Sequence, residues 1–322
     1  MVRTVIGSDD GADGHTQDHV GAGGTELIGT APRLAILGLV AARVPVVDQR
    51  IETVDAFDDH IAAALVRIKS VIDIPVRTFL DARGGRLTEE DREIARMAPL
   101  FDSGRPVVQL HFGGGTPNFL TPAQIADCVA ELRSQFSFAP RETMDFSIEL
   151  DPRFVTPDDI AELAKVGFNR ASLGVQDFDP KVQKAVNREQ SVEDTLAIVA
   201  ACREHGMRSV NIDLIYGLPK QTRAGFERTL DIVVQARPDR IAVYSYAHLP
   251  QLFKPQQRIA LEDLPSAEDK LALLQCAIER LGAAGYVYIG MDHFAKPDDD
   301  LAVAQRQGRL HRNFQGYSTH AD

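Results

Sequence analysis

From residue 105 onward, short apolar runs rich in β-branched residues alternate with segments that carry helix-start signals. The runs predicted as strands are Val107–Phe112, Phe146–Leu150, Ala171–Val175, Val210–Ile215, Ile241–Tyr246 and Tyr286–Gly290. Strands that are apolar along most of their length are typical of a parallel sheet covered by helices. Successive right-handed strand–helix units either close into a barrel or wind over both faces of a sheet.

The segments between these strands carry their own start and stop signals. Capping boxes are predicted to begin helices at Thr121, Thr156, Ser191 and Ser266. Glycines that stand where these helices should end are Gly167, Gly206 and Gly285. The sequence therefore predicts an α/β fold built from strand–helix units.

Polar residues follow the predicted strands at the point where each strand ends. These residues are Gly114, Gly115, Thr116, Glu149, Asp151, Gln176, Asp177, Asp213, Tyr216, Tyr246, His248, Asp292 and His293. A buried, unpaired carboxylate costs several kcal/mol, so we expect these groups to gather at one open mouth. In barrel enzymes that mouth is the C-terminal face of the strands, where the active site lies. Any single member of the set is equally well explained as a helix cap or a turn residue.

The stretch HFGGGTPNFL, residues 111–120, follows the first predicted strand. Three consecutive glycines allow the backbone to approach a ligand closely, because no Cβ atom intervenes. The stretch is not a dinucleotide fingerprint, which needs G-x-G-x-x-G opening the helix, and no Gly-Lys-Ser/Thr follows as in a phosphate-binding loop. Taken alone, a flexible turn is the commoner explanation of such a triplet.

Charge and composition exclude several classes of partner. The net charge of −11 disfavours a nucleic-acid surface. The longest apolar run, Leu34–Ala42, is too short to cross a bilayer, and no secretory signal is visible. The three cysteines, Cys128, Cys202 and Cys276, form no close pairs, as expected in a reducing cytoplasm. We therefore expect a cytoplasmic protein, monomeric, without a membrane span.

The N-terminal third lacks a recognisable motif. Residues 1–31 are rich in Gly, Asp and Thr and are predicted to be a disordered tail. Residues 32–92 form an unassigned segment with a predicted helix over Asp55–Ile72. A capping box at Thr88–Asp91 predicts a short helix through Arg96. The domain assigned to the strand–helix units spans residues 93–322.

Several motifs occur together in one order along this domain. They are HFGGGTPNFL (111–120), SIELDP (147–152), GVQDFDPKVQKAVNREQ (174–190), NIDLIYGLPKQT (211–222), YSYAHLP (244–250), IGMDHFAKPDDDLAVAQ (289–305) and HRNFQGYST (311–319). Together they resemble the oxygen-independent coproporphyrinogen III oxidases (coproporphyrinogen dehydrogenases) of the radical S-adenosylmethionine (SAM) superfamily. The resemblance runs from about Glu93 to the last residue of the sequence.

The resemblance implies a partial (β/α)6 barrel, with a parallel sheet, outer helices and a first strand that is missing or replaced. It implies an oxidoreductase that binds SAM and cleaves it reductively with a 4Fe-4S iron–sulfur cluster. The resulting radical would start the oxidative decarboxylation of coproporphyrinogen III to protoporphyrinogen IX in heme (porphyrin) biosynthesis. The small-molecule partners implied are thus SAM and coproporphyrinogen III.

The resemblance also implies the cofactor-binding residues. Members of the family bind two SAM molecules, and the positions that match are Gly114 and Glu149 for the first molecule. For the second molecule they are Gly115, Thr116, Gln176, Arg188, Asp213 and Ala247. Glycine amides and carboxylates suit the charged end and the ribose of SAM, and an arginine suits its carboxylate. Tyr216, Tyr246 and Arg312 are expected porphyrin neighbours; Asp292 and His293 are expected at the substrate or at a strand end, and the catalytic residues stay unassigned.

The sequence departs from the family in its cluster motif. It contains no Cys-x3-Cys-x2-Cys and no Tyr-x-His-x-Pro-Phe-Cys strand, and its first cysteine is Cys128. An iron–sulfur cluster requires thiolates that converge on one site. The family's C-terminal helical domain is also missing, so we expect a chain that is inactive as given, with no metal ligands. We hypothesise a reading frame displaced at its 5′ end and cut at its 3′ end.

Two alternatives stay open. The first is a non-catalytic barrel that binds SAM or heme and other porphyrins, similar to the heme chaperones related to this family. The second is an unrelated barrel, such as a zinc hydrolase that uses His111, His248 and His293 as ligands. Against the zinc hydrolase, the sequence contains neither His-x-His nor His-Glu-x-x-His.

Overall fold

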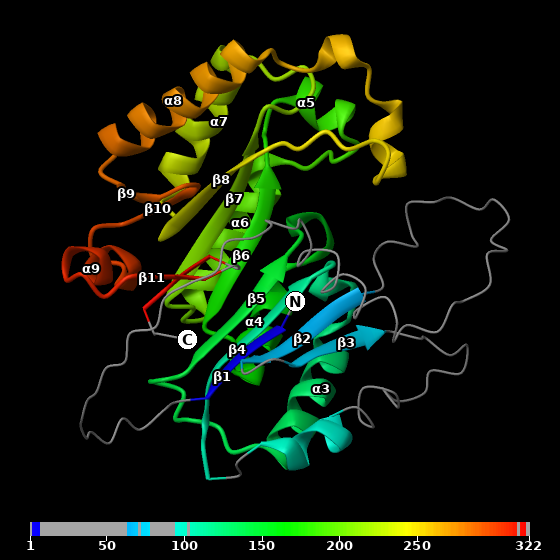
Figure 1. Ribbon diagram of the computed structural model, residues 1–322, viewed down its shortest axis with the longest axis vertical. Helices are drawn as coiled ribbons and strands as arrows, with labels where there is room; N and C mark the ends of the chain where they lie inside the picture. The colour runs from blue at the N-terminus through cyan, green and yellow to red at the C-terminus, as the bar shows by residue number, and fades with distance from the viewer. Residues whose placement is uncertain are drawn as a thin grey trace, which may run out of the picture. The chain divides into compact units, whose positions relative to one another are not determined.

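The computed structural model describes residues 2–6, 63–69, 72–77, 94–101, 104–313 and 316–319. The strands and helices described fall within one compact unit. They include a ten-stranded sheet in the order β3-β2-β1-β4-β5-β6-β7-β8-β10-β9 and a separate hairpin, β11-β12. Figure 1 shows the strands of the large sheet side by side, with β3 and β2 at one edge and β9 at the other.

The centre of the sheet is parallel, as the sequence predicts. Its strands are β4 (Val107–Gly114), β5 (Asp145–Leu150), β6 (Arg170–Gln176), β7 (Ser209–Tyr216) and β8 (Arg240–Ser245). Each pairs in parallel with the next along the chain. The predicted α/β fold with parallel strands is confirmed.

Helices connect the strands β4 to β8, and two more helices, α8 and α9, follow β8 in the chain. They are α3 (Pro122–Gln135), α4 (Pro157–Val166), α5 (Pro180–Ala185), α6 (Val192–Glu204), α7 (Arg223–Ala236), α8 (Ala267–Ala283) and α9 (Asp300–Arg306). Short 3-10 turns are η1 (Ala98–Leu100), η2 (Pro117–Phe119), η3 (Pro152–Phe154), η4 (Lys254–Arg258) and η5 (Leu261–Asp263).

The helix-end signals act as predicted at most positions. Reciprocal capping boxes form at Thr121, Thr156 and Ser266. At Ser191 only the serine half of the box forms, with Asp194 donating its amide to Ser191 Oγ at 2.9 Å. The predicted stop glycines Gly167, Gly206 and Gly285 all have positive φ angles, the conformation that ends helices. The predicted box at Thr88–Asp91 lies outside the described residues, and residues 94–97 are helical.

The two faces of the parallel strands differ in chemistry. One face carries the apolar core, in which Leu110, Phe112, Ile148, Leu173 and Ile212 are at most 3% exposed. The alternating residues on the other face are polar, as the period of two along a strand requires. They are Gln109, His111, Ser147, Glu149, Arg170, Ser172, Asn211 and Asp213. The core thus fixes the register and points this polar row to the opposite side.

At the N-terminal edge the structure differs from the prediction. The helix predicted over Asp55–Ile72 is wrong for Ala63–Lys69, which form strand β2, and Ile72–Arg77 form β3. Pairing of β2 with β1 and β3 supplies backbone hydrogen bonds that override the local helical pattern. Within residues 1–31, predicted as a disordered tail, Val2–Ile6 form β1, and the remainder lies outside the described residues.

The position of strand β1 tests the prediction that the first strand of the barrel is missing or replaced. Strand β1 lies beside β4, where that strand is expected. Its pairing with β4 is antiparallel, whereas the family-type barrel implies a parallel neighbour. The described structure therefore agrees with replacement of the first strand.

The opposite edge is also rearranged. The last predicted strand corresponds to β9 (Val287–Gly290), but β10 (His293–Ala295) lies between it and β8. Both pairings of β10 are antiparallel. Gly290 and Met291 have φ angles of 141° and 49°, so the chain reverses tightly between the two strands. The prediction that Tyr286–Gly290 directly extends the parallel sheet is wrong for this reason.

Ion pairs attach α9 to the N-terminal ends of the central strands. Arg170 on β6 contacts Asp300 through Nη2 at 2.8 Å, and Arg240 on β8 contacts Asp299 through Nε at 2.9 Å. Arg170 also pairs with Asp145 on β5 at 2.7 Å. These ion pairs therefore hold α9 against the N-terminal ends of β6 and β8, at the end of the polar face opposite the strand tips.

Candidate functional site

The tips of β4 and β5 are joined by a predicted pair of site residues. The amide of Gly114 donates to Glu149 Oε2 at 3.2 Å. Gly114 has a φ angle of 102°, a conformation that favours glycine. The glycine triplet therefore lets the β4 tip turn back toward the carboxylate of the neighbouring strand.

A histidine and a serine support this carboxylate from below. His111 Nε2 lies 3.1 Å from Glu149 Oε1, and His111 Nδ1 lies 2.8 Å from Ser147 Oγ. Burial alone would raise the pKa of Glu149, but the hydrogen bond and charge of His111 and the Gly114 amide bring it below its usual value. Glu149 is thus held as a carboxylate at the strand tip.

A second carboxylate lies two strands away, on β7. Asp213 accepts from Ser172 Oγ at 2.7 Å and from Asn211 Nδ2 at 2.7 Å. Burial raises the pKa of Asp213 to about 6, a rise that the charge of Glu149 assists and that Arg188 opposes. The two acids therefore share one electrostatic environment on the polar face.

Arginine and glutamine side chains cover the tip of β6 between these acids. Arg188 donates Nη2 to the Gly174 carbonyl at 2.6 Å and pairs with Asp151 through Nη1 at 2.9 Å. Its Nε atom is buried without a hydrogen-bond partner in the described part of the chain. A Cβ atom on Gly174 would lie 3.0 Å from Gln176 Nε2 and 3.1 Å from Arg188 Nη2, so both groups close over the glycine.

The remaining predicted site residues follow neighbouring strand tips. Gly115 and Thr116 continue from the end of β4 into η2, and Ala247 follows β8, where its carbonyl accepts from Gln256 at 3.1 Å. The strand registers pair Glu149 with Ser172 and Gly174 with Asp213. The structure thus places all eight predicted residues at the same edge of adjacent strands. Their binding of a cofactor stays a prediction.

The residues that support this edge are not predicted from the sequence. Ser147, Ser172 and Asn211 are not among the predicted site residues, and His111 is predicted only as a zinc ligand of the alternative barrel. All four lie at alternate positions of predicted strands, on the same face as Glu149 or Asp213. A polar residue two positions before a carboxylate at a strand tip is the signal that could have found Ser147 and Asn211, whereas His111 and Ser172 precede glycines at that spacing.

The three histidines of the zinc alternative have different partners. His111 contacts Ser147 and Glu149, and His248 Nδ1 lies 3.3 Å from the Tyr246 hydroxyl. The ring of His293 makes T-shaped contacts with the rings of Tyr244 and Tyr317, at centroid distances of 6.0 and 5.5 Å. Within the described ranges no three His, Cys, Asp or Glu side chains gather as metal ligands do.

The cysteines do not fit an iron–sulfur cluster. Cys128, Cys202 and Cys276 are the three cysteines of the sequence, and all are buried, with no disulfide among them. Cys128 lies on α3, Cys202 on α6 and Cys276 on α8. Helix α4 packs against both α3 and α6, and α7 packs against both α6 and α8, so the three cysteine-bearing helices are separated. Burial raises the pKa of Cys202 to about 12, so its thiol stays protonated. In the described structure these three thiols do not converge on one cluster.

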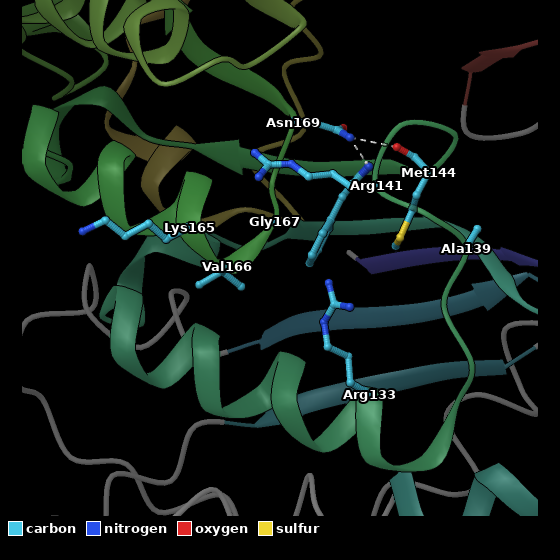
Figure 2. Close-up of a pocket in the computed structure, with 9 residues that line it drawn as sticks. Arg133, Ala139, Arg141, Met144, Lys165, Val166, Gly167 and Asn169 are labelled. Carbon is cyan, nitrogen blue, oxygen red and sulfur yellow. Dashed lines mark hydrogen bonds between the residues drawn. The ribbon is translucent and has the colours of Figure 1, made fainter.

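A hollow of about 170 Å³ lies elsewhere, near the C-terminal ends of α3 and α4. Figure 2 shows Arg133, Arg141 and Lys165 around it, with Lys165 extending away. Arg141 donates to the Ala164 carbonyl at 3.3 Å, so it acts on the last turn of α4. Arg133 lies over the ring of Phe138 at 4.7 Å and Lys165 pairs with Glu162, so each of the three cations has a partner within the protein.

Comparison with known proteins agrees with this fold and these motifs. The family model of the radical SAM superfamily matches residues 52–233, more than half of the 322 residues. The chain therefore belongs to the radical SAM superfamily. The match begins earlier than Glu93, where the motif resemblance is expected to start.

Curated relatives make the relationship more specific. Over 229 residues the chain is 54% identical to the oxygen-independent coproporphyrinogen III oxidase of Pseudomonas aeruginosa, covering 71% of this chain and 50% of the relative. Over 232 residues it is 53% identical to the Escherichia coli protein of the same name, covering 72% and 50%. The resemblance predicted from the motifs is confirmed.

A solved structure shows the same relationship. Coproporphyrinogen III oxidase (HemN) from Escherichia coli, described as a radical SAM enzyme, matches with a TM-score of 0.71 at 52% identity. The match covers 73% of this chain and 54% of that chain. The chain spans about half the length of the curated relatives it matches.

None of the described helices has the length and apolar content needed to cross a membrane.

Proposed function

We propose that this chain binds S-adenosylmethionine at the tips of β4 to β8, as the nucleoside-binding part of a coproporphyrinogen III oxidase. The observation that carries the proposal is the convergence of Glu149, Asp213 and Arg188 on one edge of the sheet. SAM presents an ammonium, a carboxylate and ribose hydroxyls. Carboxylates accept from the ammonium and the hydroxyls, and a guanidinium pairs with the carboxylate.

The role of each residue follows from its position. Gly114 and Glu149 would hold one SAM molecule. Gly115, Thr116, Gln176, Arg188, Asp213 and Ala247 would contact a second one. Arg188 supports this role, because its Nε donor has no hydrogen-bond partner among the described residues. A ligand carboxylate beside the guanidinium would satisfy that donor.

The reaction proposed for the complete enzyme is inferred from the names of the curated relatives, not from the geometry of the site. The curated relatives are named oxygen-independent coproporphyrinogen III oxidases, so coproporphyrinogen III is the proposed substrate of the complete enzyme. A bound 4Fe-4S cluster would supply the electron that cleaves the sulfonium, but the cysteines of this sequence do not fit one. We therefore propose that the chain as given binds SAM without cleaving it.

Calorimetric titration of the full chain with SAM tests the binding. We expect saturable binding, and its absence would refute the proposal. Anaerobic reconstitution with iron and sulfide, followed by iron analysis and absorbance, tests the second part. We expect no stoichiometric cluster and no 5′-deoxyadenosine; a four-iron cluster with cleaved SAM would contradict this. Binding of coproporphyrin without binding of SAM would favour the porphyrin-carrying alternative.

The cellular setting is part of the same proposal. We propose a monomer in a reducing cytoplasm, supported by three buried thiols that form no disulfide. Size-exclusion chromatography with light scattering checks the monomer, and a concentration-dependent increase in mass would contradict it.

A further inference from the structure

A buried polar cluster lies directly behind the proposed site. It consists of Asp177 after β6, Gln221 in the turn after β7, and Thr229 on α7. Their side chains are 2%, 6% and 1% exposed. Buried polar groups that are fully hydrogen-bonded fix one arrangement of the chain, because any other arrangement leaves donors unmatched.

The Asp177 carboxylate is the centre of the cluster. Its Oδ1 accepts from the Asp179 amide at 2.7 Å and from the Thr229 hydroxyl at 2.6 Å. Its Oδ2 accepts from Gln221 Nε2 at 2.6 Å. Burial raises the pKa of Asp177, although these three donors oppose the rise. Neutral donors therefore hold the carboxylate in place.

Gln221 carries the connection to β7. Its Nε2 also donates to the Ile215 carbonyl at 2.9 Å, at the end of the strand. Its Oε1 accepts from the Gly217 amide at 2.6 Å and from the Leu218 amide at 3.3 Å. One side-chain amide thus satisfies the strand end and the turn, while its remaining hydrogen faces Asp177.

Two residues of the proposed site depend on the backbone that this cluster holds. Gln176, next to Asp177, has a φ angle of 67°, which is unusual for a residue other than glycine. Its side chain lies over Gly174, which pairs in register with Asp213 on β7. A change in the spacing of the β6 and β7 tips would move Gln176 relative to Asp213.

We propose that Asp177 and Gln221 are positioning residues that hold the tips of β6 and β7 at the spacing the nucleoside site requires. This inference rests on the proposed SAM binding. Neither residue touches the ligand; each acts through the backbone of Gln176 or of the turn after Ile215. We name the bond between Asp177 and Gln221 the tip latch.

The test exchanges acceptor and donor across the tip latch. Asp177→Asn places an amide donor against Gln221 Nε2, so two donors face each other. Gln221→Glu places two carboxylates against each other and also removes the amide donor from the Ile215 carbonyl. In the double variant the amide introduced at position 177 faces the carboxylate introduced at position 221, which still accepts from Gly217 and Leu218. We expect each single variant to lower SAM affinity about tenfold or more. The double variant should bind more tightly than Gln221→Glu, because it recovers the part lost at the tip latch but not the part lost at the Ile215 carbonyl.

Controls separate positioning from general damage. Asp127→Asn changes an exposed residue of α3 in the same way and should leave affinity unchanged. Where Asp177→Asn does not fold, Thr229→Val and Thr229→Ser replace it. Loss of the hydroxyl in the valine variant should lower affinity about threefold, and the serine variant should bind as the wild type does.

Amide hydrogen exchange at Gly217 and Leu218 provides a readout that needs no ligand. Exchange should become about tenfold faster in the single variants and return toward the wild-type rate in the double variant. Unchanged exchange and affinity in Asp177→Asn would overturn the inference, as would a double variant whose losses are the sum of the two single losses. If the wild type fails to bind SAM, the proposed function fails, whereas the exchange rates still test the tip latch.

Discussion

The Glu149 carboxylate on β5 accepts the amide of Gly114 at the tip of β4, with 3.2 Å between the two atoms. The same carboxylate lies 3.1 Å from His111 Nε2 through its other oxygen. Both oxygens therefore serve the protein itself, and the β4 tip is fixed before a ligand arrives. An ionised Glu149 is the one species that accepts at both atoms.

Glu149→Gln should weaken SAM binding about 10- to 100-fold, because an amide offers one acceptor where the carboxylate offers two. The variant also lacks the negative charge that attracts the SAM ammonium. Isothermal titration with SAM measures the effect. Glu162→Gln, on the exposed side of α4, is the matched control, since its side chain is 56% exposed and pairs with Lys165 at the surface. Equal affinities for both variants would contradict the role of Glu149.

Asp213 should make stability depend on pH. Its carboxyl has a pKa of about 6 in the folded chain, against an ordinary value of 3.8. The folded state holds the proton more tightly, so the stabilisation is complete below pH 4 and is lost as pH rises through 6. Asp213→Asn should therefore be more stable than the wild type at pH 7, by about 1–3 kcal/mol. Urea unfolding at about pH 4, 5, 6 and 7 measures this.

The advantage of Asp213→Asn should disappear at about pH 4, where the folded wild type keeps its carboxyl protonated and the unfolded chain is close to its own pKa. The same variant should bind SAM more weakly at neutral pH, since the acceptor charge is gone. An advantage that is constant across this pH range would show that ionisation of Asp213 is not its cause.

Asp151 should contribute strongly to stability, because two guanidinium groups contact its carboxylate. Arg153 contacts it at 2.8 Å and Arg188 at 2.9 Å, and its side chain is 5% exposed. Asp151→Asn leaves both cations without this countercharge and should cost about 3–5 kcal/mol of unfolding free energy. Asp231→Asn, which breaks the exposed pair with Arg280, should leave the unfolding free energy nearly unchanged. Similar losses in urea unfolding would contradict this difference.

Gly290 should not tolerate a side chain. Its φ angle is 141°, and a Cβ atom would lie 3.1 Å from Tyr317 Cζ and closer still to the Tyr317 hydroxyl oxygen. Gly290→Ala should displace the ring of Tyr317 and lower stability by about 1–3 kcal/mol. Thermal unfolding measures this loss. Adding Tyr317→Ala should remove the clash, so a double variant that loses the full sum of both changes would argue against the contact.

The sequence predicts the centre of this fold well because its signals there are local. Apolar runs predict β4 to β8, and Thr121, Thr156 and Ser266 predict the first turns of their helices within three residues of chain. Strand order at the edges depends on pairing between distant segments. The insertion of β10 between β8 and β9, and the pairing of β1 with β4, leave no local trace in the sequence.

The candidate site divides in the same way. The resemblance indicates Glu149, Asp213 and Arg188, and the structure places them on one edge. The support of Glu149 by His111, and the contact between Asp177 and Gln221, join residues 38 and 44 positions apart in the chain. Such partners require the register of several strands, which a single sequence does not supply.

The ion pairs of α9 have a consequence for synthesis. Arg170 and Arg240 are translated long before Asp300 and Asp299, their partners in the folded chain. While the polypeptide emerges from the ribosome, Arg170 already has Asp145 as a partner, whereas the guanidinium of Arg240 stays hydrated until Asp299 has been made. The start of β8 should consequently complete its packing only after α9 has left the exit tunnel.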